Sequence, residues 1–182
     1  PRWDRLDDIL IMGRPRLFIG VSAGTVDSMI NNYTANKKPR SDDMYSEGGE
    51  GGRRPDYATV VYSEMARKAF PDTPIISGGV EASLRRLAHY DFWQNRVRPS
   101  VLTQLKSDLM VFGMGERVTQ RLAYEFKKAA EVQEGQLSLQ HYATQKAIDR
   151  LKQERGVAFL TTKENARTLE PRLTIPVSYT HL

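Results

Sequence analysis

Cysteine is absent from the 182 residues of this chain. Its absence excludes disulfides, thiolate zinc sites, a thiol nucleophile and an iron–sulfur cluster held by these residues. Histidine is scarce too, with three residues, and no group of His, Asp and Glu has metal-site spacing, so we expect no metal in this chain. A chain without disulfides fits a cytoplasmic protein, and we expect that location.

Long apolar runs are also absent. No run approaches the roughly 18–20 apolar residues that a membrane span requires, so we expect no membrane partner. The opening residues, Pro1–Arg5, are charged and lack the apolar core of a signal peptide. They contain no starting methionine either, and we interpret the chain as a piece of a longer protein.

Charge of both signs is plentiful. Charged residues make up 27% of the chain and hydrophobic residues 40%, which is typical of a soluble globular domain. The formal net charge of +5 is compatible with a polyanionic partner. Acidic residues lie among the basic ones, and this favours an ordinary solvated surface over a dedicated nucleic-acid patch.

Short apolar runs alternate with segments of helical period. This alternation predicts an α/β domain with a doubly wound, mostly parallel sheet and helices on both faces. A further short helix, or two turns, is expected around Leu84–Phe92, where apolar residues recur at helical spacing. The expected strands are 17–21, 74–77, 108–112 and 156–161, and the expected helices are 3–12, 55–70, 117–134 and 138–151.

Residues 34–54 form a polar, glycine-rich stretch without apolar periodicity. Loops of this length inside a domain are usually functional lids or disordered segments. The run Gly48–Gly52 is not a phosphate-binding loop, because no strand precedes it and it lacks the Gly-Lys-Ser/Thr ending.

Small residues follow three successive expected strands. In open α/β sheets, ligands bind beyond the carboxyl ends of the strands, and glycine allows the backbone to approach them closely. The sequence therefore predicts a pocket at this carboxyl edge of the sheet. The predicted pocket residues are Ser22, Gly24, Asp27, Gly78, Gly79, Glu81, Ser83, Arg85, Gly113, Gly115 and Glu116, with His89 nearby and Asn31 and Tyr33 as second-tier candidates.

Several of these side chains admit two interpretations. Glu81 and Glu116 could pair for acid–base work, or each could bind a backbone amide or a neighbouring arginine. Arg85 could hold a phosphate or carboxylate in a bidentate manner, or it could pair with Glu81 one helical turn away. His89 could act as a general base or ligand, although a lone histidine is more often structural.

Four longer motifs together carry a resemblance to a known family. The motifs are Asp27–Ala35, Arg54–Asp56, Gly78–Asp91 and Ser107–Glu116. Over roughly residues 3–161 the chain resembles the N-terminal domain of the YgiQ-like radical SAM proteins. The resemblance implies a Rossmann-like, cobalamin-binding-like domain over 1–161, and the polar residues 162–182 are predicted to be a linker or irregular tail.

The family's architecture implies a barrel after this domain. In that barrel a Cys-x3-Cys-x2-Cys motif holds a [4Fe–4S] cluster that binds S-adenosylmethionine (SAM). This chain has no cysteine, so it cannot carry the cluster, and we expect no catalytic residue in it. The signature Asp-x-His-x-x-Gly of cobalamin domains is also absent, which argues against cobalamin.

The resemblance identifies the chain as a fragment. It is expected to start after the first strand of the family's domain and to stop before the barrel, its expected partner. Residues 176–182 depart from the family pattern and resemble read-through of adapter sequence. A sheet truncated at its N-terminal edge leaves an unpaired strand, so we expect the isolated chain to dimerise or to be poorly soluble.

Two functions follow from these observations. The first is an accessory domain of a radical SAM enzyme, whose substrate the resemblance does not define, that shapes a substrate or partner pocket at the carboxyl edge. The alternative is a non-catalytic binding module for RNA or another polyanion, with residues 36–54 supplying the charge.

Overall fold

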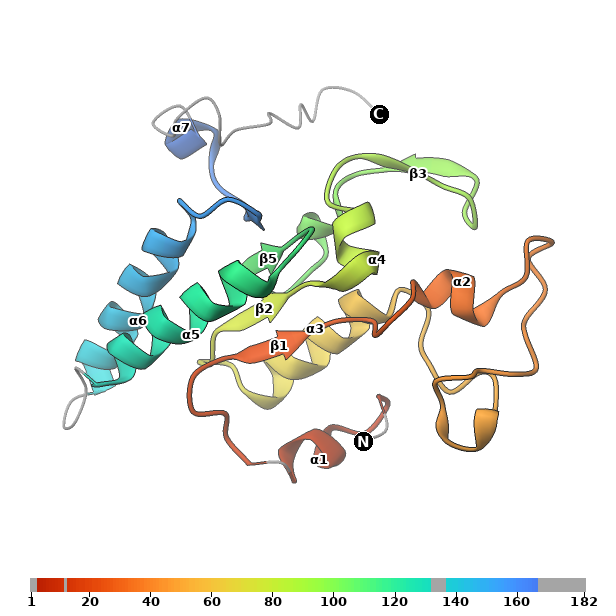
Figure 1. Ribbon diagram of the computed structural model, residues 1–182, viewed down its shortest axis with the longest axis horizontal. Helices are drawn as coiled ribbons and strands as arrows, with labels where there is room; N and C mark the ends of the chain where they lie inside the picture. Colours follow the sequence, from red (N-terminus) through yellow and green to blue (C-terminus); the bar gives the residue numbers. More distant parts are fainter. Residues whose placement is uncertain (1–2, 12, 132–136, 167–182) are drawn as a thin grey trace.

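The computed structural model describes residues 3–11, 13–131 and 137–166, and their core is a four-stranded sheet (Figure 1). The strand order is β1-β2-β5-β6, with the first three strands parallel. The predicted α/β class and mostly parallel sheet are confirmed. The sheet strands are β1 (Ile19–Val21), β2 (Ile75–Ser77), β5 (Leu109–Val111) and β6 (Val157–Ala158).

The last strand is the antiparallel member of this mostly parallel sheet, because β6 pairs antiparallel with β5. Two helices, α5 (Glu116–Glu131) and α6 (Leu137–Leu151), lie between these strands and pack against each other. One crossover helix returns the chain to the start of a parallel strand. A pair of helices instead brings the chain back to the edge where β5 ends, so the next strand runs in the opposite direction.

Helices cover both faces of the sheet. Ile75 of β2 packs with Ala66 of α3 (Ala58–Ala69), whereas the next residue, Ile76, belongs to the cluster formed with α5 and α6. Successive residues of a strand point to opposite faces, so this split places α3 and the α5–α6 pair in separate layers. Helix α1 (Leu6–Leu10) packs against α3. The doubly wound arrangement is therefore present.

The larger apolar cluster lies under α5 and α6. Val118, Leu122 and Phe126 recur at helical spacing along α5 and are buried against Leu151 of α6. The ring of Phe126 also contacts Phe18, with centroids 5.5 Å apart. Burial of these side chains supplies the main hydrophobic stabilisation of this half of the domain.

The helix expected around Leu84–Phe92 is wrong beyond its first residue. Helix α4 (Gly79–Leu84) ends at Leu84, and β3 (His89–Asp91) pairs antiparallel with β4 (Arg96–Arg98) to form a hairpin. The turn is fixed by Asn95, which has a φ of 54°, and by the Asp91 carboxylate, which accepts the Gln94 amide at 3.0 Å. These local polar bonds compete successfully with a helix.

The connecting segments contain further short elements. Residues 34–54 are folded by isolated β-bridges and by a buried carboxylate, Asp43, which pairs with Arg54 at 3.1 Å. Residues 176–182 lie outside the described part of the chain. Within the described part, no helix is long and apolar enough to cross a membrane. The further elements are α2 (Ser28–Asn32), η1 (Glu47–Gly49), η2 (Val101–Thr103) and α7 (Lys163–Ala166).

Candidate functional site

The segments that follow β1, β2 and β5 meet at the carboxyl edge of the sheet, beyond the arrowheads in Figure 1. A Cβ on Gly79 would lie 3.1 Å from the Cβ of Ser22, and Ser83 Oγ accepts the Gly113 amide at 3.3 Å. The predicted convergence of these residues is therefore observed. Gly79 has a φ of 84°, so both the contact and the backbone require glycine there.

The other predicted glycines line the same edge. Gly24 is exposed with a φ of 98°, and its Cβ position lies 3.2 Å from Arg54 Nη1. The Gly78 amide donates to the carbonyl of Val21 at 2.9 Å. Gly115 accepts from the first turn of α5 through its carbonyl, so it acts as part of the helix start.

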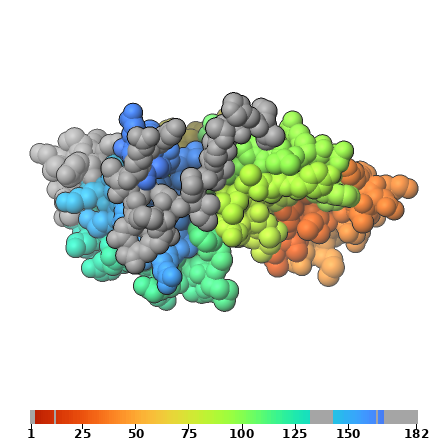
Figure 2. Space-filling view, turned by 90° about the horizontal axis from the view of Figure 1, so that it is seen from above, coloured from red at the N-terminus to blue at the C-terminus, as the bar shows by residue number. Residues whose placement is uncertain are grey.

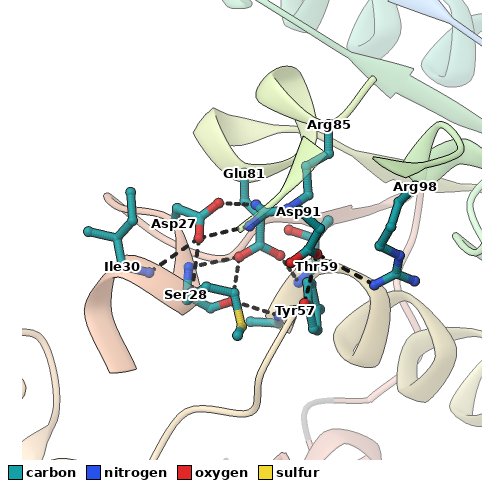
Figure 3. A network of polar contacts seen from close by, with 11 residues as sticks. Asp27, Ser28, Ile30, Tyr57, Thr59, Glu81, Arg85, Asp91 and Arg98 are labelled. Atoms are coloured by element: carbon teal, nitrogen blue, oxygen red, sulfur yellow. Dashed lines mark hydrogen bonds and ion pairs between the residues drawn. The ribbon is translucent and has the colours of Figure 1, made fainter. Parts of the chain in front are cut away.

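Glu81 is the centre of a buried polar network (Figure 3), and its side chain is 2% exposed. One carboxylate oxygen accepts from the Ser28 amide at 2.8 Å and from the Ser28 hydroxyl at 2.5 Å. The other oxygen accepts from the Thr59 amide at 2.9 Å. Of the two interpretations offered for Glu81, the structure supports binding to backbone amides.

These bonds occupy the start of α3. The Ala58 amide donates to Ser28 Oγ at 3.0 Å, beside the Thr59 amide that donates to Glu81. In Rossmann-like folds the start of a helix that follows a parallel strand commonly binds the phosphate of a nucleotide. Here a carboxylate of the chain itself takes that position, so this helix start has no free amide pair for a ligand anion.

Asp27 and Arg85 form a second part of the network. The Asp27 carboxylate caps α2 by accepting from the Met29 amide at 2.9 Å, and both of its oxygens accept from the Arg85 guanidinium. The two side chains are 4% and 12% exposed. Of the two interpretations offered for Arg85, the pairing with Glu81 is wrong, because Arg85 extends across to Asp27 in the β1–α2 segment instead.

Asp91 anchors the hairpin to the same network. It is 3% exposed and accepts from the hydroxyl of Tyr57 at 2.7 Å, while the Arg98 guanidinium lies 3.8 Å away. Burial disfavours the charged Asp91 carboxylate, but its hydrogen bonds and Arg98 prevail and hold its pKa below the ordinary value. Burial and the Asp91 bond raise the pKa of Tyr57 to about 12.

Tyr57 has a left-handed backbone, with φ 50° and ψ 48°, directly before α3. A bulky residue rarely adopts this conformation, which therefore depends on the surrounding contacts. The guanidinium carbons of Arg85 and Arg98 lie 5.6 Å and 5.1 Å from the centre of its ring. The ring thus joins the Asp27 and Asp91 parts of the network.

The remaining four predicted residues also lie outside this network. His89 is half-buried in β3, with Nδ1 3.1 Å from the carbonyl oxygen of Leu87. Glu116 is exposed in the first turn of α5 and does not pair with the buried Glu81. Asn31 contacts its neighbour Asn32, and Tyr33 donates to Asp56 at 2.8 Å.

Sequence reasoning missed several members of the network. The partners of Ser28, Tyr57 and Thr59 lie 22 to 53 residues away along the chain, so no local pattern marks these three residues. Within the described residues no group of three or more His, Cys, Asp or Glu side chains could hold a metal ion. The missed residues are Ser28, Tyr57, Thr59, Asp91 and Arg98.

A surface hollow lies away from this network, on α5 and beyond the end of α6. The predicted pocket at the carboxyl edge therefore stays a prediction. The residues that line the hollow are Arg117, Gln120, Arg121, Tyr124 and Glu154.

A family model described as radical SAM N-terminal matches residues 1–173. The chain belongs to this family. The chain is 52% identical to a UPF0313 protein of Thermotoga maritima over 133 residues, which are 73% of this chain and 24% of the relative. A UPF0313 protein of Vibrio vulnificus is 48% identical over 132 residues, 72% of this chain and 17% of the relative.

This radical SAM N-terminal domain spans about a quarter or less of the length of the curated relatives it matches. A UPF0313 protein of Pseudomonas syringae is 52% identical over 131 residues, and the match likewise covers only 17% of that protein. No solved structure gives a significant match. The resemblance seen in the sequence motifs is thus confirmed at the level of the family.

Proposed function

We propose that this N-terminal domain supports a radical SAM enzyme by presenting the carboxyl edge of its sheet to a substrate or to the cluster-bearing part of the full-length protein. The buried network holds the segments after β1 and β2 and the β3–β4 hairpin in fixed positions. Its own polar groups are largely satisfied internally, so it acts as a support for the surface above it.

The observation that carries this proposal is a group of exposed apolar side chains at the carboxyl edge. Val80 is 48% exposed, Leu84 61% and Met114 84%. Val80 and Leu84 are four residues apart on α4, and the Ser83–Gly113 bond ties α4 to the loop that contains Met114. Large apolar side chains gathered at one edge typically mark an interaction surface.

The family implies a [4Fe–4S] cluster and SAM for the full-length protein. The residues of this chain do not fit such a cluster, since none of its 182 residues is cysteine. We therefore assign the cluster, and the radical that it generates from SAM, to other parts of the full-length protein. Binding and positioning are the roles left for the residues of this domain.

Hydrogen–deuterium exchange of the full-length protein and of this 182-residue chain tests the proposal. We expect amides of Val80–Leu84 and Gly113–Gly115 to exchange more slowly in the full-length protein. The Leu84→Glu variant should remove that protection, because a charge resists burial in an apolar interface. Leu160→Glu is the matched control, since Leu160 is 58% exposed and belongs to no part of this edge. Equal exchange in both proteins would refute contact of this edge with the cluster-bearing part of the full-length protein.

A further inference from the structure

The β3–β4 hairpin turns an aromatic face outward. Tyr90 is 58% exposed and Phe92 47%, and Val97, the cross-strand neighbour of Tyr90, is 51% exposed. Asp91 between them is buried and holds the opposite face of the hairpin against Tyr57. The alternation of a strand therefore separates an anchored inner face from a free outer face.

A stack of rings links this outer face to the segment after α2. The rings of Phe92 and Trp93 meet edge to face, with centroids 5.2 Å apart. Trp93 in turn lies 5.3 Å from the ring of Tyr33. The hairpin and the segment near residue 33 lie against each other at one end of the molecule in the space-filling view (Figure 2). The two segments form one surface.

Two cations border the rings. Lys37 Nζ lies 4.7 Å above the Phe92 ring and donates to the Trp93 carbonyl at 3.4 Å. Arg40 donates to the Tyr33 carbonyl at 3.1 Å. These partners are neutral, and neither cation has a carboxylate partner within the described residues.

The rest of the 34–54 segment behaves differently. Arg53 forms an ion pair with Glu50, and Arg54 with the buried Asp43. Carboxylates of the chain thus neutralise the charge at the far end of this segment. The uncompensated charge is left beside the aromatic face of the hairpin.

We infer that this hairpin patch binds single-stranded nucleic acid. Exposed rings stack on unpaired bases, and nearby cations attract the phosphates between them. This function goes beyond the proposed role at the carboxyl edge. The sequence predicted that the whole of residues 36–54 supplies the charge of a polyanion site, whereas the patch uses only the first part of that segment together with the hairpin. The patch consists of Tyr90 and Phe92 as stacking residues and Lys37 and Arg40 as cations.

The patch suits a single strand better than a duplex. Bases inside a duplex are stacked on each other, so aromatic side chains reach only bases that are splayed out. The strands of the hairpin have three residues each, which limits the patch to a few nucleotides. We therefore expect weak selectivity for sequence and a clear preference for unpaired RNA or DNA.

Fluorescence anisotropy of the 182-residue chain with a labelled oligouridine of about ten nucleotides tests this inference. Phe92→Leu keeps an apolar side chain at this exposed position but removes the ring, and we expect binding to weaken about fivefold or more. Tyr124→Leu is the matched control, because Tyr124 is 55% exposed on α5, and this variant should bind like the wild type.

Charge is tested separately by salt dependence. Lys37→Gln should weaken binding and reduce the slope of log affinity against log salt by about 0.7, the value for one phosphate contact on a single strand. Lys128→Gln, on the last turn of α5, should leave the slope unchanged.

Three results would overturn the inference. They are no binding at low salt, equal binding of a duplex, and equal losses in the patch and control variants. A loss of self-association in Phe92→Leu, measured by light scattering, together with no oligonucleotide binding, would assign the patch to a protein partner instead.

Discussion

The two halves of this domain are held together by different physics. Under α5 and α6, apolar side chains such as Leu122 and Phe126 are buried in a common cluster. At the carboxyl edge, Asp27, Glu81 and Asp91 are buried just as completely, but their contacts are hydrogen bonds and ion pairs. Apolar contacts tolerate small shifts, whereas a buried charge needs each donor in place.

This difference indicates that the two halves have different roles, one in stability and one in positioning. The α5–α6 half supplies stabilisation that depends little on direction, and the deeply buried charge of Glu125 is neutralised there by Arg121 and Arg150. The carboxyl-edge network fixes the positions of four separate segments relative to one another. Positioning of this kind is what a binding surface at that edge requires.

The largest expected effect is at Glu81. Glu81→Ala leaves the amides of Ser28 and Thr59 buried without their acceptor, and we expect a loss of about 3–5 kcal/mol in the free energy of unfolding. Urea denaturation followed by circular dichroism measures this value. A loss below about 1 kcal/mol would show that water enters and replaces the carboxylate.

Double variants test whether the residues of the polar network depend on one another. Ser28→Ala removes a partner of Glu81, so the double variant should lose less than the sum of the single losses. Combined with Leu122→Ala, which lies in the other half, the effect of Glu81→Ala should instead be additive. Additivity of both pairs would argue against a connected network.

The second prediction concerns the stability of the apolar half. Leu122 is 1% exposed, and Leu122→Ala should cost about 2–5 kcal/mol through lost burial and the cavity left behind. Because no charge is involved, this loss should be the same at pH 5 and pH 8. A strong change of the loss with pH would mean that the variant also disturbs the nearby Glu125 ion pairs.

The apolar half was predictable from the sequence. The helical spacing of Val118, Leu122 and Phe126 and the short run at 108–112 determine two of its elements directly. The convergence of Ser22, Gly79 and Gly113 also follows from the rule that parallel strands end at one edge. Helices, strands and the ends of strands depend on residues that are close together along the chain, so a single sequence is enough to predict them.

The polar network was not predictable in the same way. Arg85 lies one helical turn from Glu81, yet it pairs with Asp27, 58 residues away. Glu81 is unavailable to Arg85 because backbone amides from two other segments already bind it. The hairpin was missed for a related reason, since apolar spacing at Leu84–Phe92 matches a helix while Asp91 and Asn95 build a turn.

The third effect depends on pH. The folded-state pKa of Asp91 lies below its ordinary value, so its contribution to stability is present at neutral pH and is lost as the pH falls below about 5. Asp91→Asn should therefore be less stable than the wild type at pH 7, with a difference that shrinks toward acidic pH. Thermal melting at several pH values measures this, and a difference independent of pH would refute a charged Asp91.

The smallest effect isolates one hydrogen bond. Tyr57→Phe removes the hydroxyl that donates to Asp91, and we expect a loss of about 1 kcal/mol at pH 7. Tyr124→Phe, on the exposed face of α5, should change stability by less than about 0.5 kcal/mol.

Alkaline pH separates this bond from simple packing. The pKa of Tyr57 is raised to about 12 in the folded state, so its neutral form contributes stability below the unfolded value of about 10. That contribution is lost as the pH rises from about 10 to 12. The difference between the wild type and Tyr57→Phe should therefore disappear over this window, whereas a difference due to packing alone would persist through it.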